Sequence, residues 1–150
     1  MMEIPRDEML GMAKSLIYNA YAPYSKIRVA SVVYACRRFF PGVNVENASY
    51  GLTICAERNA IARMITEGCQ EISGILVYSE DVEPIPCGAC LQVISEFSKQ
   101  DIPILVAYKD QKTLYKLSEL FPKAFRLRVF SPSSRLSRLL SPEAVDRILY

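Results

Sequence analysis

Apolar and polar positions follow two different periods along this chain, one helical and one typical of strands. Between Asp7 and Tyr18, apolar side chains recur every three or four residues, which predicts a helix with one buried face. Residues 27–35 are rich in β-branched side chains and predict a strand. Residues 39–45 predict its partner, joined to it by a tight turn at 36–38.

The middle of the chain alternates between helical and strand-like patterns. Residues 56–66 carry one apolar face and are followed by Gly68, which predicts a helix that ends there. Residues 88–99 predict a second helix. Residues 72–78 and 102–108 are nearly continuous apolar runs, as expected of strands buried on both faces. Helices that alternate with such strands indicate parallel pairing and a layered α/β domain.

The chain has 150 residues, which suits one domain with its own core. We expect that domain to span 1–130 and to be followed by a tail, 131–150, of short helices packed on the domain or on a neighbour. The longest uncharged run, 84–95, is too short to cross a bilayer. The N-terminus has early acids and no apolar segment of the kind found in secretory signals. We therefore expect no membrane partner.

The net charge is only +2, but it is unevenly spread. From residue 121 onward, six bases stand against two acids. A basic tail can contact nucleic acid, but such charge is more often a solvated surface or a subunit contact. We therefore do not expect a nucleic-acid partner. The six bases are Lys123, Arg126, Arg128, Arg135, Arg138 and Arg147.

Five cysteines are an odd number, and three of them have the spacing of metal ligands. This usage favours a reducing, cytoplasmic compartment. The other two, Cys36 and Cys69, fall in the predicted turn and after a helix end. We expect both to be ordinary half-buried cysteines.

The three spaced cysteines occur in Cys55-Ala56-Glu57 and Pro86-Cys87-Gly88-Ala89-Cys90. Each motif begins a predicted helix, where the free N–H groups and the helix dipole stabilise thiolates. Residues three apart on a helix share a face, so Cys87 and Cys90 can converge on one ion. Three protein ligands on Zn²⁺ leave a fourth position for water, as in catalytic sites. The alternative is a structural zinc site with a further ligand, although the chain contains no histidine.

Two charged residues stand two and three positions after Cys55. Glu57 is not needed as a ligand and can accept a proton from zinc-activated water and pass it on; the alternative is an exposed glutamate favoured by the helix dipole. Arg58 can donate to the sulfurs and offset the negative charge of three thiolates on zinc. The alternative for Arg58 is a surface arginine.

With these motifs the chain resembles the small, zinc-dependent, homotetrameric cytidine deaminases. The cysteine and glutamate spacing is the signature of the zinc nucleobase deaminases. The resemblance covers most of residues 15–125 and is carried by residues 21–26, 44–58 and 86–90, and more weakly by 120–122 and Phe125.

The resemblance implies a three-layer α/β/α fold with a five-stranded mixed sheet, and active sites completed by neighbouring subunits. It also implies zinc-dependent hydrolysis of cytidine and 2′-deoxycytidine to the uridine forms plus ammonia, in pyrimidine salvage. Glu57 would transfer protons to N3 and then to the leaving amine. The backbone at Cys55 and Ala56 would help to hold the base.

Asn44 and Glu46 match the family's ribose-binding pair. Strand alternation agrees, because it places Val43 and Val45 on one face and the two polar residues on the other; the alternative is a polar strand end. By resemblance, Tyr50 is lent to a neighbouring site, and Phe125 covers the base from another subunit. Phe125 could equally be a core residue.

The chain departs from the family pattern at four places. Ile27 stands where many relatives have phenylalanine near the pyrimidine, and Ala30-Ser31 replaces a frequent Gly-Ala. The turn at 36–38 lacks Asp-Gly, and the familiar ending after Phe125 is absent. Two other activities therefore stay open. One is deamination of another aminated base or nucleoside analogue. The other is editing of nucleic acid, for which the basic tail is the only support.

Overall fold

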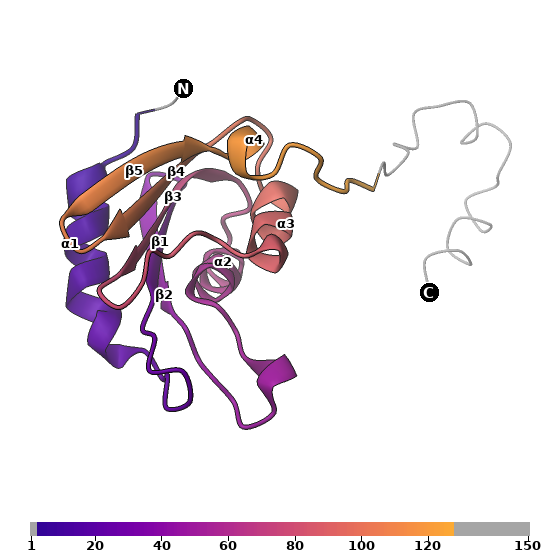
Figure 1. Ribbon diagram of the computed structural model, residues 1–150. Helices are drawn as coiled ribbons and strands as arrows, with labels where there is room; N and C mark the ends of the chain where they lie inside the picture. Colours follow the sequence, from indigo (N-terminus) through magenta and orange to yellow (C-terminus); the bar gives the residue numbers. More distant parts are fainter. Residues whose placement is uncertain (1–2, 128–150) are drawn as a thin grey trace, which may run out of the picture.

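The computed structural model describes residues 3–127, which form a five-stranded sheet flanked by helices (Figure 1). The predicted tail, 131–150, lies outside the described residues. In chain order the elements are α1 (Arg6–Leu16), η1 (Ile17–Asn19), β1 (Ala30–Ala35), β2 (Arg38–Val43), η2 (Tyr50–Leu52), α2 (Ala56–Thr66), β3 (Ile72–Ser79), α3 (Gly88–Glu96), β4 (Pro103–Tyr108), β5 (Gln111–Lys116) and α4 (Leu117–Leu120).

The strands lie in the order β2-β1-β3-β4-β5. Only β3 and β4 pair in parallel, and the other pairs are antiparallel. The predicted mixed sheet and the parallel pairing of the two apolar strands are therefore confirmed. The predicted tight turn between β1 and β2 is a two-residue loop in which Cys36 and Arg37 have φ angles of 50° and 58°. Positive φ at both positions matches the twist of a hairpin.

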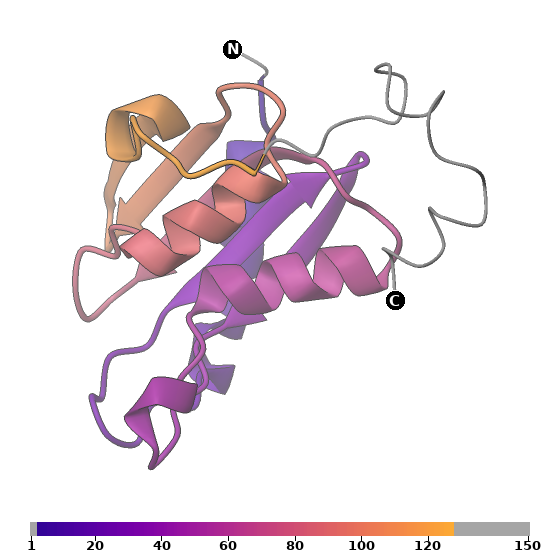
Figure 2. The ribbon, with the colours of Figure 1, turned by 90° about the vertical axis from the view of Figure 1, so that its right-hand side faces the viewer.

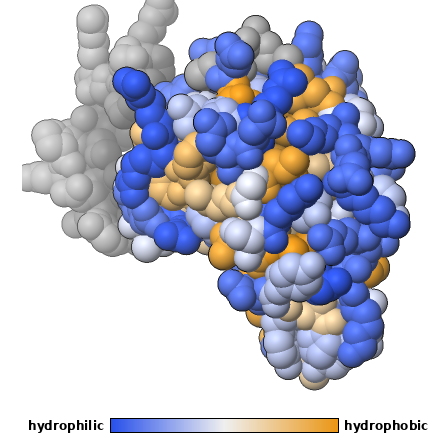
Figure 3. Space-filling view, turned by 90° about the vertical axis from the view of Figure 1, so that its left-hand side faces the viewer, coloured by the Kyte–Doolittle hydropathy of each residue, from blue (hydrophilic) through white to orange (hydrophobic). Residues whose placement is uncertain are grey.

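Each face of the sheet is covered by its own core, which confirms the three-layer arrangement (Figure 2). On one face α1 packs its buried Met9 and Leu10 against Val32 and Leu76. On the other face α2 and α3 pack against a second set that includes Ile75, the residue before Leu76 in β3. Figure 3 shows the side of the molecule that carries α1, where hydrophilic side chains dominate and leave smaller hydrophobic areas between them.

Strand β2 and helix α2 approach each other more closely than side chains would allow. A Cβ atom at Gly42 would lie 2.6 Å from the carbonyl oxygen of Ala56 and within contact of the backbone nitrogen of Ala60. Only glycine lets the two backbones meet there. This contact fixes the first turn of α2, which carries the Cys-Ala-Glu motif, against the sheet.

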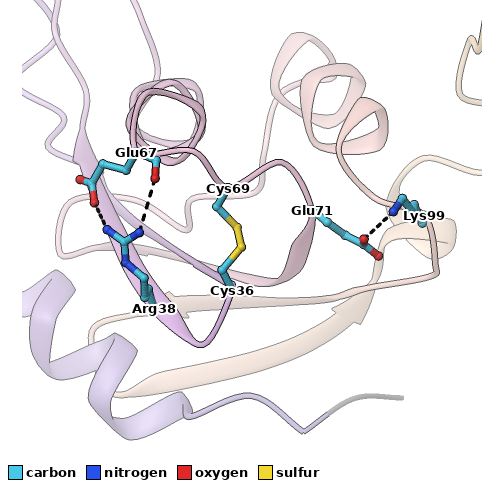
Figure 4. Close-up of a disulfide and its surroundings, with 6 residues drawn as sticks. All are labelled: Cys36, Arg38, Glu67, Cys69, Glu71 and Lys99. Atoms are coloured by element: carbon cyan, nitrogen blue, oxygen red, sulfur yellow. Dashed lines mark hydrogen bonds and ion pairs between the residues drawn. A yellow bond between two sulfur atoms is a disulfide. The ribbon is translucent and has the colours of Figure 1, made fainter.

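The structure corrects the expectation for Cys36 and Cys69, which form a disulfide (Figure 4). Cys36 is exposed in the β1–β2 turn, and this turn lies against the end of α2. After α2 the chain reverses at Gly68 (φ +84°) and leads into the buried Cys69. An ion pair between Arg38 and Glu67 joins the same two segments. The two cysteines are 33 residues apart, so their meeting depends on packing and not on local spacing.

Strand β5 was not indicated by the apolar pattern. It lies at the sheet edge and its side chains are mostly exposed, so it lacks the continuous apolar run of a buried strand. Among the described residues, no helix is both long and apolar enough to cross a membrane.

Candidate active site

Three sulfur atoms meet where the N-termini of α2 and α3 face each other. Cys55 is the N-cap residue of α2, Cys87 is the N-cap residue of α3, and Cys90 lies in the first turn of α3. Their sulfur atoms lie within 4.8 Å of one another, and the Cys55 and Cys87 sulfurs are 4.0 Å apart. The structure thus brings together the three cysteines that the spacing singled out.

Cys55 and Cys90 do not ionise equally. Hydrogen bonding from Cys90, with a further contribution from Arg58, lowers the pKa of Cys55 to about 5. The same bond to Cys55, together with burial, raises the pKa of the Cys90 thiol. Cys55 therefore forms a thiolate more readily than Cys90, and a bound metal ion would displace the proton of Cys90.

Arg58 lies beside the sulfurs. Its Nη2 atom donates to the Cys55 sulfur at 3.7 Å and to the carbonyl oxygen of Thr53 at 3.3 Å. Its Nε atom is buried and has no hydrogen-bond partner among the described residues. A guanidinium with a buried, unpartnered nitrogen is favoured there by nearby negative charge, which three thiolates on zinc would supply.

Glu57 projects from the first turn of α2 and is only 4% exposed. Burial, with the nearby charge of Cys55, raises the pKa of its carboxyl to about 7. Glu57, Ala56 and Cys55 line one wall of a cavity of about 220 Å³, which Asn44 and Cys87 also reach. A poorly solvated carboxyl group beside a metal-binding cluster is suited to proton transfer.

This cavity is also lined by residues that the motifs did not indicate. Val29, before β1, and the loop after β3, with Val82, Pro84 and Ile85, line it. No residue-type signal marks these apolar positions. Only the loop's place directly before Cys87 could have suggested it.

Asn44 is 9% exposed, and its amide is held on both sides. Its Oδ1 atom accepts a hydrogen bond from the backbone nitrogen of Val29 at 2.8 Å. Its Nδ2 atom donates to the carbonyl oxygen of Ile27, also at 2.8 Å. The second hydrogen of Nδ2 is left for another partner.

Glu46 lines a second cavity of about 370 Å³, which shares Thr53 with the first. Its Oε1 atom accepts hydrogen bonds from the backbone nitrogens of Tyr24 at 3.0 Å and Ser25 at 3.1 Å. Hydrogen bonding, first of all from Ser25, lowers the pKa of the Glu46 carboxyl. Tyr50 lines the same cavity, with its ring 5.9 Å from that of Tyr24.

Phe125 is not brought to either cavity. Its side chain is 71% exposed, and its carbonyl oxygen accepts a hydrogen bond from Gln92 of α3 at 2.9 Å. The role predicted for it in a neighbouring subunit stays a prediction. A larger cavity, of about 540 Å³, lies between α3 and α4 and contains none of the predicted site residues.

Comparison with known proteins gives one consistent result. The family model for the cytidine and deoxycytidylate deaminase zinc-binding region matches residues 5–106. The chain is 33% identical over 128 residues to the cytidine deaminase of Mycoplasma genitalium, covering 83% of this chain and 98% of that protein. It is 42% identical over 124 residues to a probable cytidine deaminase of Dictyostelium discoideum, covering 79% and 82% of the two chains.

A solved structure agrees with these relatives. The crystal structure of cytidine deaminase from Burkholderia pseudomallei superposes with a TM-score of 0.75 and 35% identity, over 81% of this chain and all of that chain. The donor set fits the metal of the family, because three convergent thiols with an arginine beside them suit Zn²⁺. On its fold, its thiol cluster and these matches, the chain belongs to the cytidine and deoxycytidylate deaminase zinc-binding family.

Proposed function

We propose that this protein is a hydrolase that converts cytidine and 2′-deoxycytidine into uridine and 2′-deoxyuridine with release of ammonia, in pyrimidine salvage. One observation carries the proposal: a buried glutamate lines the same cavity as Cys55 and Cys87, two of the three convergent thiols. Relatives that match nearly their whole length are named cytidine deaminases, which supports it.

In the proposed mechanism Cys55, Cys87 and Cys90 hold the zinc ion. When bound, zinc polarises a water molecule and lowers its pKa. Glu57 would accept one proton from the water and pass it to N3 of the base as the water oxygen bonds to C4. It would then take the remaining proton from the new C4 hydroxyl and deliver it to the amine, which leaves as ammonia when the C4–N bond breaks. Burial of Glu57 excludes bulk water and keeps the pKa of its carboxyl above that of an exposed glutamate, which favours donation as well as acceptance. Arg58 offsets the thiolate charge, and the backbone at Cys55 and Ala56 holds the base.

The sugar would lie between the two cavities, against Asn44 and Glu46. Backbone N–H groups already occupy Oε1 of Glu46, so Oε2 is the atom we assign to the 3′-hydroxyl. Oε2 accepts, and the remaining Nδ2 hydrogen of Asn44 is the donor of the pair. A site that hydrogen-bonds a hydroxyl in this way discriminates strongly against analogues that lack it.

The charges favour a free nucleoside over a nucleotide. Among the described residues, no lysine or arginine lines either cavity. Lys26 is close enough to help lower the pKa of the Glu46 carboxyl, but it does not line the wall. A 5′-phosphate would need cationic partners, and the lining of these two cavities supplies none.

We infer a homotetramer with shared active sites. Large apolar side chains beside the sugar cavity and at the end of the described chain are exposed, and a neighbouring subunit would bury them. Tyr50 is 75% exposed and Phe125 71%, and these are the two residues that we assign to neighbouring sites. We further infer that residues 1–130 are the catalytic domain.

The proposed location is the cytoplasm, because the three site thiols bind zinc only while they are reduced. The Cys36–Cys69 disulfide argues in the opposite direction, since such bonds are rare in reducing compartments. Alkylation of the protein as it is released from cells separates the two cases. Labelling of Cys36 would show that the pair is reduced in the cell.

The direct test is uridine formation from cytidine by the purified zinc-loaded protein and by Glu57→Gln. The wild type should be active and the variant inactive with its zinc content unchanged. Glu8→Gln, the same chemical change at an exposed position of α1, is the matched control and should be fully active. Activity in Glu57→Gln would indicate a structural zinc site. A zinc-loaded wild type that leaves cytidine intact would direct the search to other aminated bases.

A further inference from the structure

Arg28 and Asp81 join two segments that are 53 residues apart in the chain. The backbone nitrogen of Arg28 donates to Oδ2 of Asp81 at 2.9 Å. The guanidinium adds two bonds, from Nε to Oδ2 at 3.3 Å and from Nη2 to Oδ1 at 3.4 Å. The ring of Tyr18 lies under the guanidinium, 5.2 Å from its central carbon. One carboxylate thus fixes both the main chain and the side chain of Arg28.

Ser79 makes the second connection between the same segments. Its buried hydroxyl donates to the carbonyl oxygen of Arg28 at 2.7 Å. It also accepts from the backbone nitrogens of Asp81 at 3.0 Å and Val82 at 3.4 Å. We call Arg28, Ser79 and Asp81 the Arg28 network.

The opposite edge of the same short segment is bonded to Asn44. The carbonyl oxygen of Ile27 and the backbone nitrogen of Val29 face the Asn44 amide. The backbone groups of Arg28 face the end of β3, at Ser79, and the loop after it, at Asp81. Residues 27–29 therefore lie between a site residue on one side and the loop on the other. A shift of the loop after β3 would therefore change its distance from residues 27–29, and a shift of residues 27–29 would change their distance from Asn44.

The connected parts are walls of the cavity beside Glu57. Val29 and Asn44 line the cavity next to the thiol cluster, and Val82 and Ile85 of the loop line it as well. Arg28, Ser79 and Asp81 do not line it. They act on the cavity only through the residues beside them.

The ion pair itself would add little to stability. The Arg28 and Asp81 side chains are 34% and 26% exposed, and isolated pairs of that kind are weak. Hydrogen bonds from Arg28, first of all from its backbone nitrogen, hold the pKa of the Asp81 carboxyl below its usual value, so the carboxylate is charged at neutral pH. The effect of the network is therefore expected in geometry more than in folding free energy.

We propose that Ser79 and Asp81 are positioning residues that set the width of the cavity through Arg28, and so determine how tightly the nucleoside base is bound. This inference rests on the proposed function, because it places the base in that cavity. The first turns of α2 and α3 hold the thiols and Glu57 independently of the network. The network therefore acts on KM and leaves kcat and zinc binding nearly unchanged.

The test is Asp81→Asn, which removes the charge and one acceptor oxygen but keeps the size of the side chain. KM for cytidine should rise about tenfold, the factor expected for one charge-assisted hydrogen bond, with kcat within about twofold of wild type. The control is Glu71→Gln, which neutralises the carboxylate of a surface ion pair with Lys99 and should leave KM unchanged. Arg28→Gln combined with Asp81→Asn should raise KM no further than the larger single effect, because both changes break the same contact.

A second readout does not depend on activity. Hydrogen–deuterium exchange at Arg28 and at Val82 should accelerate in Asp81→Asn and in Ser79→Ala, while the amides of α2 keep their protection. An active wild type with unchanged KM in Asp81→Asn would overturn the positioning role and leave the proposed function standing. An inactive wild type would overturn the function, and unchanged exchange would then overturn the network too. Loss of zinc from Asp81→Asn would also contradict the inference.

Discussion

Gly42 and Ala56 meet backbone to backbone, with no room for even a methyl group between strand β2 and the first turn of α2. Ala56 stands between the first thiol and the buried carboxyl, so this contact sets where both groups lie relative to the sheet. Of the six glycines, Gly42 is the one where an added Cβ would meet backbone atoms, and it lies against the turn that carries the catalytic motif.

Gly42→Ala is therefore expected to damage activity as well as stability. The added methyl must displace the start of α2, at a cost of about 1–3 kcal/mol in the free energy of unfolding. We expect kcat to fall at least tenfold, because the shift moves Glu57 relative to the zinc ligands. Steady-state kinetics and thermal unfolding measure the two effects.

The matched control is Gly11→Ala in α1, where an added methyl meets nothing within 4 Å. It should leave activity unchanged and stabilise the helix slightly, since alanine is the better helix former. Full activity in Gly42→Ala would show that α2 can shift without consequence for catalysis.

Arg58→Ala tests the offsetting of thiolate charge. Without the guanidinium, three thiolates on zinc leave a net negative site that polarises water less strongly. We expect kcat to fall about tenfold while about one zinc ion per chain is retained. The control, Arg63→Ala, removes an arginine of the same helix that pairs with Glu67 at the surface, and it should keep wild-type turnover. Unchanged turnover in Arg58→Ala would contradict the assigned role.

Removal of zinc should abolish activity reversibly. A chelator is expected to eliminate uridine formation, and added Zn²⁺ should restore it, because the ligands are contributed by two helix N-termini that the core holds in place. Cys87→Ser replaces the most exposed of the three thiols, and its activity should not return with added zinc. Metal analysis by mass spectrometry accompanies both assays. Recovery of Cys87→Ser on zinc addition would remove Cys87 from the ligand set.

The Cys36–Cys69 disulfide should contribute to stability and not to catalysis. It closes a loop across a separation of 33 residues, for which the chain-entropy model gives roughly 3–4 kcal/mol. Cys36→Ser is expected to lower the free energy of unfolding by an amount of this order with kcat unchanged. A metal-compatible reductant should lower the stability of the wild type to that of the variant and leave the variant unaffected. Equal stability of the two proteins without reductant would contradict the prediction.

What the sequence predicts well here is local. The helical period of 56–66 and the apolar runs of β3 and β4 follow from short stretches, and the spacing of Cys87 and Cys90 places both on one turn. To predict that these cysteines converge on Cys55, only one further assumption is needed, namely that the N-termini of the two helices face each other. These features need little knowledge of distant contacts.

The rest depends on which distant segments meet. Strand β5 carries no apolar run because an edge strand needs none, and the disulfide links a hairpin turn to the end of a helix. The Arg28–Asp81 contact joins two loops whose residue types have no metal-ligand or catalytic signature. The amide of Asn44 matches a sugar-binding pattern in the sequence, but its bonds to residues 27 and 29 appear only in the folded chain.

The 4.0 Å between the sulfurs of Cys55 and Cys87 also has a consequence for how the protein matures. An oxidant that reaches the chain before the metal does could join these two neighbouring thiols. A Cys55–Cys87 bond would remove two zinc ligands at once. Bound zinc would therefore protect both thiols, and a chain oxidised before metal loading would be folded but inactive until a reductant restored its ligands.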